Sequence, residues 1–199
     1  NYTLADNLRY FIIYKPYKVL SQYTDEAENK GLGSIFRIPN GIYAVGRLDL
    51  DSEGLLILTN DKKLNIALLN PENEYKRIYH VEVEGTPSTT ALKALTEGLS
   101  ITIDGKSYRT KKTEARVLID YNLPERSPAV NRIKHTETSW VEVILTEGKN
   151  RQVRKMTAKL GHPTLRLIRV GIEDLVLHPL MPGQIVMISK KVLYKKLKL

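Results

Sequence analysis

Three acidic residues precede an apolar run in the segment GRLDLDSEGLLILTND, which spans residues 46–61. In an extended chain alternate residues face the same side, so Asp49, Asp51 and Glu53 would present their carboxylates together while the other side faces the core. A calcium loop is excluded, because its closing position requires a bidentate Glu and the sequence has Asn60 there. Two interpretations remain open from this segment alone: an acidic turn before a core strand, or a catalytic aspartate supported by neighbouring groups.

A second segment combines a helix pattern with an excess of positive charge. Lys149, Arg151 and Arg154 crowd the beginning of a helix that the spacing of apolar residues predicts at 151–160. Cations at the positive end of a helix dipole cost about 0.3–1 kcal/mol each, and a nearby anion would reverse that sign. Backbone N–H groups and both arginines would point towards a phosphate or carboxylate placed there. The alternative is a solvated basic face.

The composition favours a polyanionic partner. Lysine and arginine number 31 against 22 acidic residues, which gives a net charge of +9, and nucleic acid is the partner that such a balance favours. No segment approaches the roughly 18 apolar residues of a membrane-spanning helix, so we expect no membrane partner. With no cysteine and four histidines that lack metal-ligand spacing, we expect no disulfide, no metal site and a cytoplasmic location.

The pattern of apolar residues and turn signals predicts an α+β fold with a mainly antiparallel central sheet and flanking helices and loops. Strands are expected at 10–14, 42–45, 55–59, 77–84, 113–119, 140–145, 164–170 and 184–188, and helices at 62–69, 89–97 and 151–160. Segments 21–40 and 120–138 contain Gly, Pro, Asn and mixed charge, and are expected to be long loops. We expect residues 1–199 to form a single domain, as one unit or as two closely joined lobes.

GRLDLDSEGLL resembles the catalytic-aspartate motif of the pseudouridine synthases, specifically of their RsuA-type branch. Three further segments resemble the family's lysine-proline, tyrosine and arginine motifs, in the family's order: YKPYKVL at 14–20, KRIYHVEVEG at 76–85 and EGKNRQVRKM at 147–156. The details QYTDE and TLRLIRVGI are most similar to the short RluE-like members that act on large-subunit ribosomal RNA. The resemblance therefore implies the pseudouridine synthase fold. Many members carry a small RNA-binding module before the catalytic domain, but we expect none here because the first catalytic strand is expected by about Tyr10.

The resemblance also implies roles for individual residues. Asp49 corresponds to the catalytic aspartate, which acts as a nucleophile or as a base, and Arg154 corresponds to the arginine that pairs with it. Such a pair keeps the carboxylate ionised when a flipped base closes the pocket. Tyr79 corresponds to the tyrosine placed against the uracil ring, and Leu165 to the leucine that floors the same pocket. From the sequence pattern alone, an ordinary core position is favoured for Tyr79, and such a position is nearly as compatible with Leu165 as the pocket role is.

Four further residues are candidates for substrate binding. Arg47 corresponds to the arginine that fills the space left by a flipped base, and its alternative role is a surface salt bridge to a nearby acid. Lys15 belongs to the opening motif of the family. Lys149 and Arg151 stand at the beginning of the basic helix, where we expect them to face phosphate.

The function implied by the resemblance is the isomerisation of one uridine to pseudouridine in large-subunit ribosomal RNA or its assembly intermediate. The reaction would use base flipping, need no cofactor and be carried out by a monomer. A catalytically silent RNA-binding or assembly protein on the same fold is the alternative, and glycosidase-like hydrolysis is disfavoured because no second acid across the bond is evident. The basic stretches 109–116, 132–135 and 189–199 are candidates for RNA contact or for solvated surface, and the last also for disorder.

Overall fold

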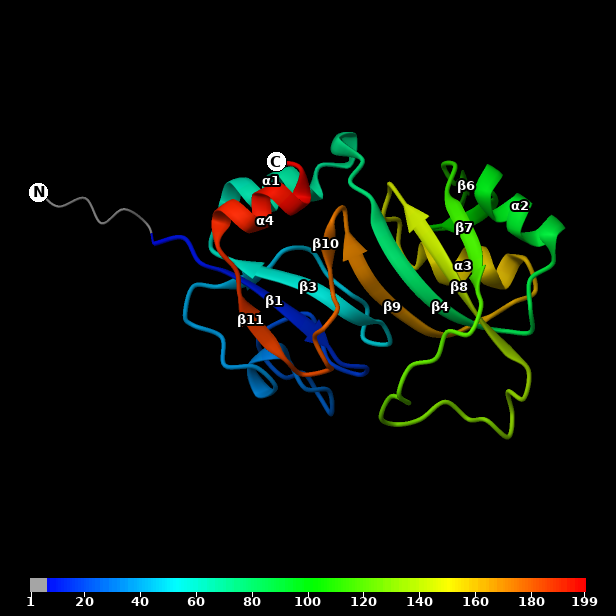
Figure 1. Cartoon of the computed structure of the whole chain (residues 1–199), viewed down its shortest axis with the longest axis horizontal. Coiled ribbons are helices and arrows are strands. Elements are labelled where there is room, and N and C mark those ends of the chain that lie inside the picture. The colour runs from blue at the N-terminus through cyan, green and yellow to red at the C-terminus, as the bar shows by residue number, and fades with distance from the viewer. Residues whose placement is uncertain (1–6) are drawn as a thin grey trace, which may run out of the picture.

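The structure, a computed structural model, describes residues 7–199 (Figure 1). Its strands are β1 (Tyr10–Lys15), β2 (Tyr43–Ala44), β3 (Glu53–Thr59), β4 (Arg77–Glu84), β5 (Ser100–Ile103), β6 (Lys106–Arg109), β7 (Glu114–Leu118), β8 (Thr138–Leu145), β9 (Thr164–Ile172), β10 (Leu175–Val176) and β11 (Ile185–Met187). Its helices are α1 (Lys62–Leu69), α2 (Thr89–Glu97), α3 (Gln152–Lys159) and α4 (Lys190–Leu197), with short 3-10 helices η1 (Leu32–Ser34) and η2 (Pro71–Asn73).

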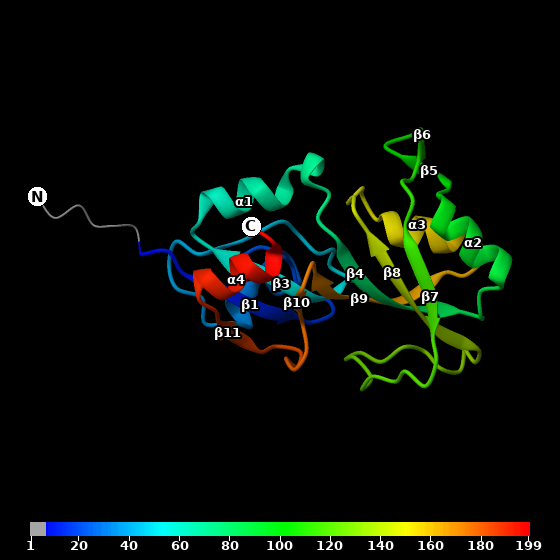
Figure 2. The same cartoon turned by 45° about the horizontal axis from the view of Figure 1, so that its top comes forward.

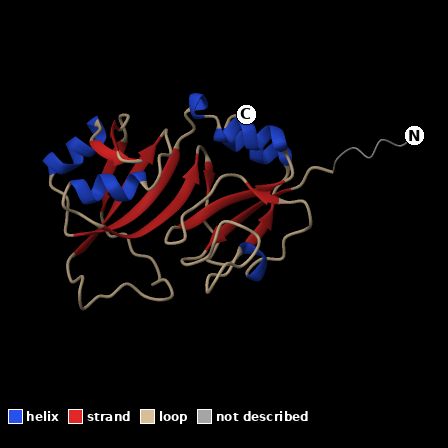
Figure 3. Ribbon diagram, turned by 180° about the vertical axis from the view of Figure 1, so that it is seen from behind, coloured by secondary structure: helices blue, strands red, loops and turns tan. Residues whose placement is uncertain are grey.

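Nine strands form one mixed sheet in the order β11-β1-β3-β9-β4-β8-β7, with β10 paired to β9 and β2 to β3. Every pairing among these strands in residues 7–199 is antiparallel except β3 with β9. The predicted α+β class with a mainly antiparallel sheet is therefore confirmed. Figure 3 shows the α-helices of both halves of the sheet along the same side of the molecule.

Apolar side chains of the sheet pack against the helices and loops that cover it. In the half that holds β1 and β3, one face packs against α1 and α4, and the other packs against η1 and its neighbouring loop. In the half that holds β4 and β8, the apolar residues pack against α2 and α3. Both faces of β1 and β3 are consequently buried, which explains why these strands are apolar throughout rather than at every second residue.

The two halves of the sheet meet where β3 pairs with β9 over only two positions. Gly54 lies opposite Arg169 with φ +112°, and a Cβ added at Gly54 would lie 2.3 Å from the Arg169 carbonyl oxygen. No residue with a side chain fits this close approach. Beside it, the guanidinium of Arg166 donates to both carboxylate oxygens of Glu53 at 2.8 and 3.1 Å, with both side chains buried. The residues before β3 are thereby held against the second half of the sheet.

A hairpin of β5 and β6 lies outside the predicted elements. Its two-residue turn consists of Asp104 and Gly105, which both have positive φ. An Asp-Gly pair between alternating residues is the usual signal for such a turn. This signal could have identified the hairpin from the sequence, and the hairpin contributes Tyr108 to the lining of the cavity described below.

The basic C-terminal stretch is a packed helix rather than a disordered tail. Leu193 and Leu197 of α4 are fully buried four residues apart, as the inward face of a helix requires. The Tyr194 hydroxyl donates to Asp61 Oδ2 at 2.6 Å, and the Tyr10 hydroxyl donates to the same oxygen at 2.7 Å. Figures 1 and 2 show α4 beside α1, whose first turn Asp61 caps. Deletion of this stretch would remove core side chains, so it cannot isolate an RNA contact.

Asp61 links β1, α1 and α4 through its side-chain hydrogen bonds. Its Oδ1 accepts from the backbone N–H groups of Lys63 and Leu64 while its Oδ2 holds the two tyrosines. Burial raises the pKa of the Asp61 carboxyl, but the hydrogen bonds from Tyr194 and Tyr10 outweigh it and bring the pKa below its ordinary value. The apolar packing of α4 is thus reinforced by a polar contact that only the folded chain assembles.

Candidate active site

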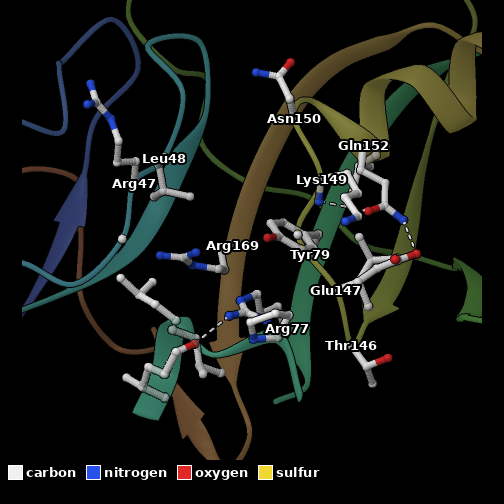
Figure 4. Close-up of a pocket in the computed structure, with 18 of the residues that line it drawn as sticks. Arg47, Leu48, Arg77, Tyr79, Thr146, Glu147, Lys149, Asn150, Gln152 and Arg169 are labelled. Atoms are coloured by element: carbon white, nitrogen blue, oxygen red, sulfur yellow. Dashed lines mark hydrogen bonds between the residues drawn. The ribbon is translucent and has the colours of Figure 1, made fainter. Parts of the chain in front are cut away.

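A cavity of about 600 Å³ opens between the two halves of the sheet (Figure 4). Its walls come from residues 45–49, the end of α1, strands β4 and β9, and residues 145–153 before and within α3. Its charged lining residues are the cations Arg47, Arg77, Lys111, Lys149, Arg151 and Arg169 and the acids Asp49, Glu74 and Glu147. Cations exceed acids two to one, so the cavity attracts an anionic ligand.

Asp49 begins a tight turn at the cavity wall. The Ser52 N–H donates to the Asp49 carbonyl at 3.0 Å, so the segment bends before β3 instead of running straight. The expected row of three carboxylates on one side is therefore wrong, because the turn separates the acids and Glu53 is buried against Arg166. Asp49 keeps 43% of its side chain exposed, which leaves its carboxylate available to a ligand.

Arg151 is the cation that contacts this turn. Its Nη1 and Nη2 atoms each lie 2.8 Å from an oxygen of Asp51, and Nη1 lies 3.4 Å from Asp49 Oδ2. Arg151 adopts φ 51° and ψ 34° immediately before α3, a left-handed conformation that is uncommon for a residue with a side chain. The hydrogen bond from Arg151 lowers the pKa of Asp51, helped by the charge of Arg154 and opposed by burial. The anion expected at the beginning of α3 is thus a carboxylate of the same chain.

Arg154 occupies a different place from the one expected. Its Nη2 donates to the backbone carbonyl of Asp51 at 2.6 Å and lies 3.5 Å from that residue's carboxylate. No ion pair joins Arg154 to Asp49 within residues 7–199, and Arg151 is the arginine that contacts Asp49 in this structure. Arg154 contacts the backbone of the turn at Asp51 and does not line the cavity. Burial lowers the pKa of its guanidinium group.

Tyr79 and Arg169 face the cavity from neighbouring strands (Figure 4). Tyr79 of β4 is paired with Arg169 of β9, and Arg169 Nε donates to the Leu55 carbonyl at 2.9 Å. Leu165 does not line the cavity; Leu167, two residues later on β9, lines it instead. The sequence reasoning missed Arg169, although an arginine inside an apolar strand is a signal of function or of a specific partner.

Two of the remaining candidates line the cavity and one does not. Arg47 and Lys149 line it, and no ion pair links Arg47 to an acid within residues 7–199. Lys15 is fully buried, with its Nζ donating to the carbonyls of Val19 at 2.6 Å and Pro16 at 2.9 Å. Burial lowers the pKa of Lys15 to about 8. In this structure Lys15 does not face the cavity. Its ammonium group instead holds the turn that follows β1.

That turn supports the segment around Asp49. The Ser21 hydroxyl donates to the Leu48 carbonyl at 2.6 Å and accepts from the Leu48 N–H at 2.9 Å. The Lys18 N–H donates to the Leu50 carbonyl at 2.9 Å. The residues on both sides of Asp49 are thus fixed, Leu48 by the Ser21 hydroxyl and Leu50 by the backbone N–H of Lys18 in the opening motif. Sequence alone gave no reason to identify Ser21 as a residue that positions Asp49.

Replacement of Ser21 by alanine should lower kcat by about tenfold to a hundredfold, because small displacements of a reacting group have costs of that order. RNA affinity should stay within about threefold, since the hydroxyl is buried and contacts only Leu48. Ser139→Ala is the matched control, as its hydroxyl also donates to a backbone carbonyl, that of Gly85, at 2.7 Å. Equal loss of kcat in both variants, measured well below their melting temperatures, would show a general loss of stability rather than a displaced Asp49.

Residues 7–199 contain neither a metal-binding cluster nor a membrane-spanning helix. No cluster of three or more His, Asp or Glu side chains in this part of the chain could hold a metal ion. None of its helices is long and apolar enough to cross a membrane.

The model of the family described as RNA pseudouridylate synthase matches residues 9–159, which run from β1 to the end of α3 and carry the turn at Asp49. The chain belongs to this family. A protein of Xanthomonas campestris pv. campestris named ribosomal large subunit pseudouridine synthase E is 45% identical over 175 residues, which cover 87% of this chain and 91% of that protein. A protein of the same name from Vibrio vulnificus is 40% identical over 173 residues, which cover 87% of this chain and 72% of that protein.

A crystal structure of a pseudouridylate synthase has the same fold, with a TM-score of 0.76 and 24% sequence identity over 95% of this chain and 74% of that one. The predicted family and the pseudouridine synthase fold are confirmed by these matches. Membership of the RNA pseudouridylate synthase family also confirms the prediction of an isomerase.

Proposed function

We propose that this pseudouridine synthase isomerises a uridine of large-subunit ribosomal RNA, with Asp49 as the catalytic carboxylate and the target base flipped into the cavity. The observation that carries the proposal is the position of Asp49, which is partly exposed and held 3.4 Å from Arg151 in the cavity that Tyr79 also lines. Relatives at 40% and 45% identity are named as synthases of the large ribosomal subunit, which supports the substrate class.

The reaction rearranges one nucleoside without loss of atoms. The bond between ribose C1′ and uracil N1 breaks, the uracil turns, and a bond forms between C1′ and C5. C5 then loses its proton while N1 gains one, so neither an oxidant nor a group donor is needed. Asp49 can serve as a nucleophile towards the sugar or base, or as the base that removes a sugar proton, and the proposal holds for each route.

The other cavity residues supply binding and orientation. Tyr79 offers an aromatic ring to a base, and stacking on such a ring is worth about 1–3 kcal/mol. A uridine inside duplex RNA must leave the stack before Asp49 can reach it, and Arg47 lies at the cavity wall two residues away, where it can occupy the gap. Lys149 and Arg169 add positive charge that attracts the phosphates on either side.

Affinity for RNA outside the cavity depends on cations that are free of internal partners. Arg132 is committed to Glu82 and Glu125, and Lys111 to Glu74. Lysines of α4 at positions 190, 191 and 195 have no ion-pair partner among residues 7–199. Within the basic stretches, α4 therefore contributes available charge, as do Arg109, Lys112 and Lys134, which also lack an ion-pair partner among residues 7–199.

The proposal is tested with transcripts of large-subunit and small-subunit ribosomal RNA that carry tritium at uracil C5. Because C5 loses its hydrogen, each turnover releases tritium to water. We expect release from the large-subunit transcript to reach a plateau at the content of a single uridine, with none from the small-subunit transcript. Release from the small-subunit transcript alone would overturn the substrate class, and release from neither would favour a silent RNA-binding protein on this fold.

A further inference from the structure

A second aromatic ring, that of Tyr108 on β6, lines the cavity next to Glu147 and Lys149. We propose that this end of the cavity is a subsite for the nucleotide next to the target uridine, with Tyr108 stacked on its base and Lys149 against its phosphate. The inference rests on the proposed function and adds a specificity contact to the same site. Any base can stack on an aromatic ring, so the subsite recognises an unstacked neighbouring nucleotide whatever the identity of its base.

A hydrogen-bond network around Glu147 fixes the position of the Tyr108 ring. Its hydroxyl donates to Glu147 Oε2, and Glu147 is buried. The other oxygen of Glu147 accepts from Gln152 Nε2 at 2.8 Å and from the Lys111 N–H at 2.7 Å. The hydrogen bond to Glu147 raises the pKa of Tyr108 to about 12, so the ring stays neutral and donates at physiological pH. A ring fixed in advance loses little entropy when a base stacks on it.

Lys149 places its charge over one face of that ring, so a base that stacks on this face must displace the ammonium towards its phosphate. Its Nζ lies 5.0 Å from the Tyr108 ring centroid, and its backbone N–H donates to Gln152 Oε1 at 3.1 Å (Figure 4). Lys111 at the same end is paired with Glu74, whereas Lys149 has no ion-pair partner among residues 7–199. Lys149 is therefore the cation that can meet a phosphate without breaking an internal pair.

Tyr108→Ala tests the subsite with a short RNA that carries the modified uridine and with two versions of it that lack the base on the 5′ or the 3′ side. On intact RNA we expect KM to rise about tenfold with kcat nearly unchanged, in keeping with the loss of one stacked base. On one of the two abasic RNAs, the wild-type protein should show the same rise, and Tyr108→Ala should add nothing to it. Tyr108→Phe, which keeps the ring and loses only the hydroxyl, should stay within about threefold of wild type.

A second variant tests the charge without altering the ring. Lys149→Met should reduce the slope of log affinity against log salt by about 0.7–0.9, the value for one neutralised phosphate. An unchanged slope, or an equal loss for Tyr108→Ala on the intact RNA and on both abasic RNAs, would overturn the subsite. Failure of the wild-type protein to release tritium from the intact RNA would instead overturn the proposed function, and the subsite with it.

Discussion

Asp49→Asn should abolish isomerisation, with a loss of at least about a thousandfold, while RNA affinity stays within about threefold. The amide has nearly the shape of the carboxylate and can still accept the 3.4 Å contact from Arg151, but it is neither a base nor a nucleophile. A single carboxylate contributes nothing favourable against phosphates, so binding should be spared. Single-turnover tritium release measures the first quantity, and filter binding at fixed salt measures the second.

Asp51→Asn is the control for that result, because it makes the same chemical change two residues later in the same turn. Asp51 is committed to Arg151 by two hydrogen bonds of 2.8 Å, so its variant should lose about tenfold through a less well placed arginine. The reverse order, with Asp51→Asn inactive and Asp49→Asn active, would move the catalytic role to Asp51.

Arg151→Lys should lower kcat by about a hundredfold with a modest change in RNA affinity. The planar guanidinium holds Asp51 at two points and reaches Asp49 with the same Nη1 atom. A lysine ammonium is a single point of charge and cannot serve both carboxylates in this geometry. Comparison of kcat and KM under saturating RNA separates the loss of alignment from the loss of charge.

Arg154→Lys provides the contrast one helical turn away. The buried Arg154 guanidinium donates to the Asp51 carbonyl rather than to Asp49, so this variant should lose about tenfold or less in kcat. A larger loss for Arg154→Lys than for Arg151→Lys would mean that RNA binding rearranges the pair into the arrangement that family resemblance implied. Thermal melting of both variants shows whether the buried position costs stability in addition.

Strong local patterns allowed most of the fold to be predicted. The apolar runs at 10–14 and 55–59 form β1 and β3, and the 3.6-residue spacing at 62–69 and 89–97 forms α1 and α2. The helix at 89–97 also begins with a capping side chain, Ser88, that accepts from a backbone N–H of its first turn. In each of these segments a local signal and the tertiary packing agree, which is the condition under which sequence patterns are reliable.

The candidate site was harder to predict, because it depends on geometry that spacing does not encode. Spacing could not indicate that Arg151, rather than Arg154, contacts Asp49 in this structure, because the contact accompanies a left-handed conformation of Arg151 just before α3. Leu165, which the family resemblance implied, does not line the cavity; it is the extra residue of β9 where the pairing with β4 shifts register between Glu82 and Val83. A bulge changes which residues share a face, and it leaves no periodic trace in the sequence.

The most direct test of the central claim is a map of pseudouridines in large-subunit ribosomal RNA incubated with the wild-type protein or with Asp49→Asn. Carbodiimide derivatisation followed by primer extension reports each pseudouridine as a stop at a known position. We predict one new stop after treatment with the wild-type protein and none with the variant at equal RNA occupancy. A map without any new stop, or the same stop from both proteins, would contradict the account.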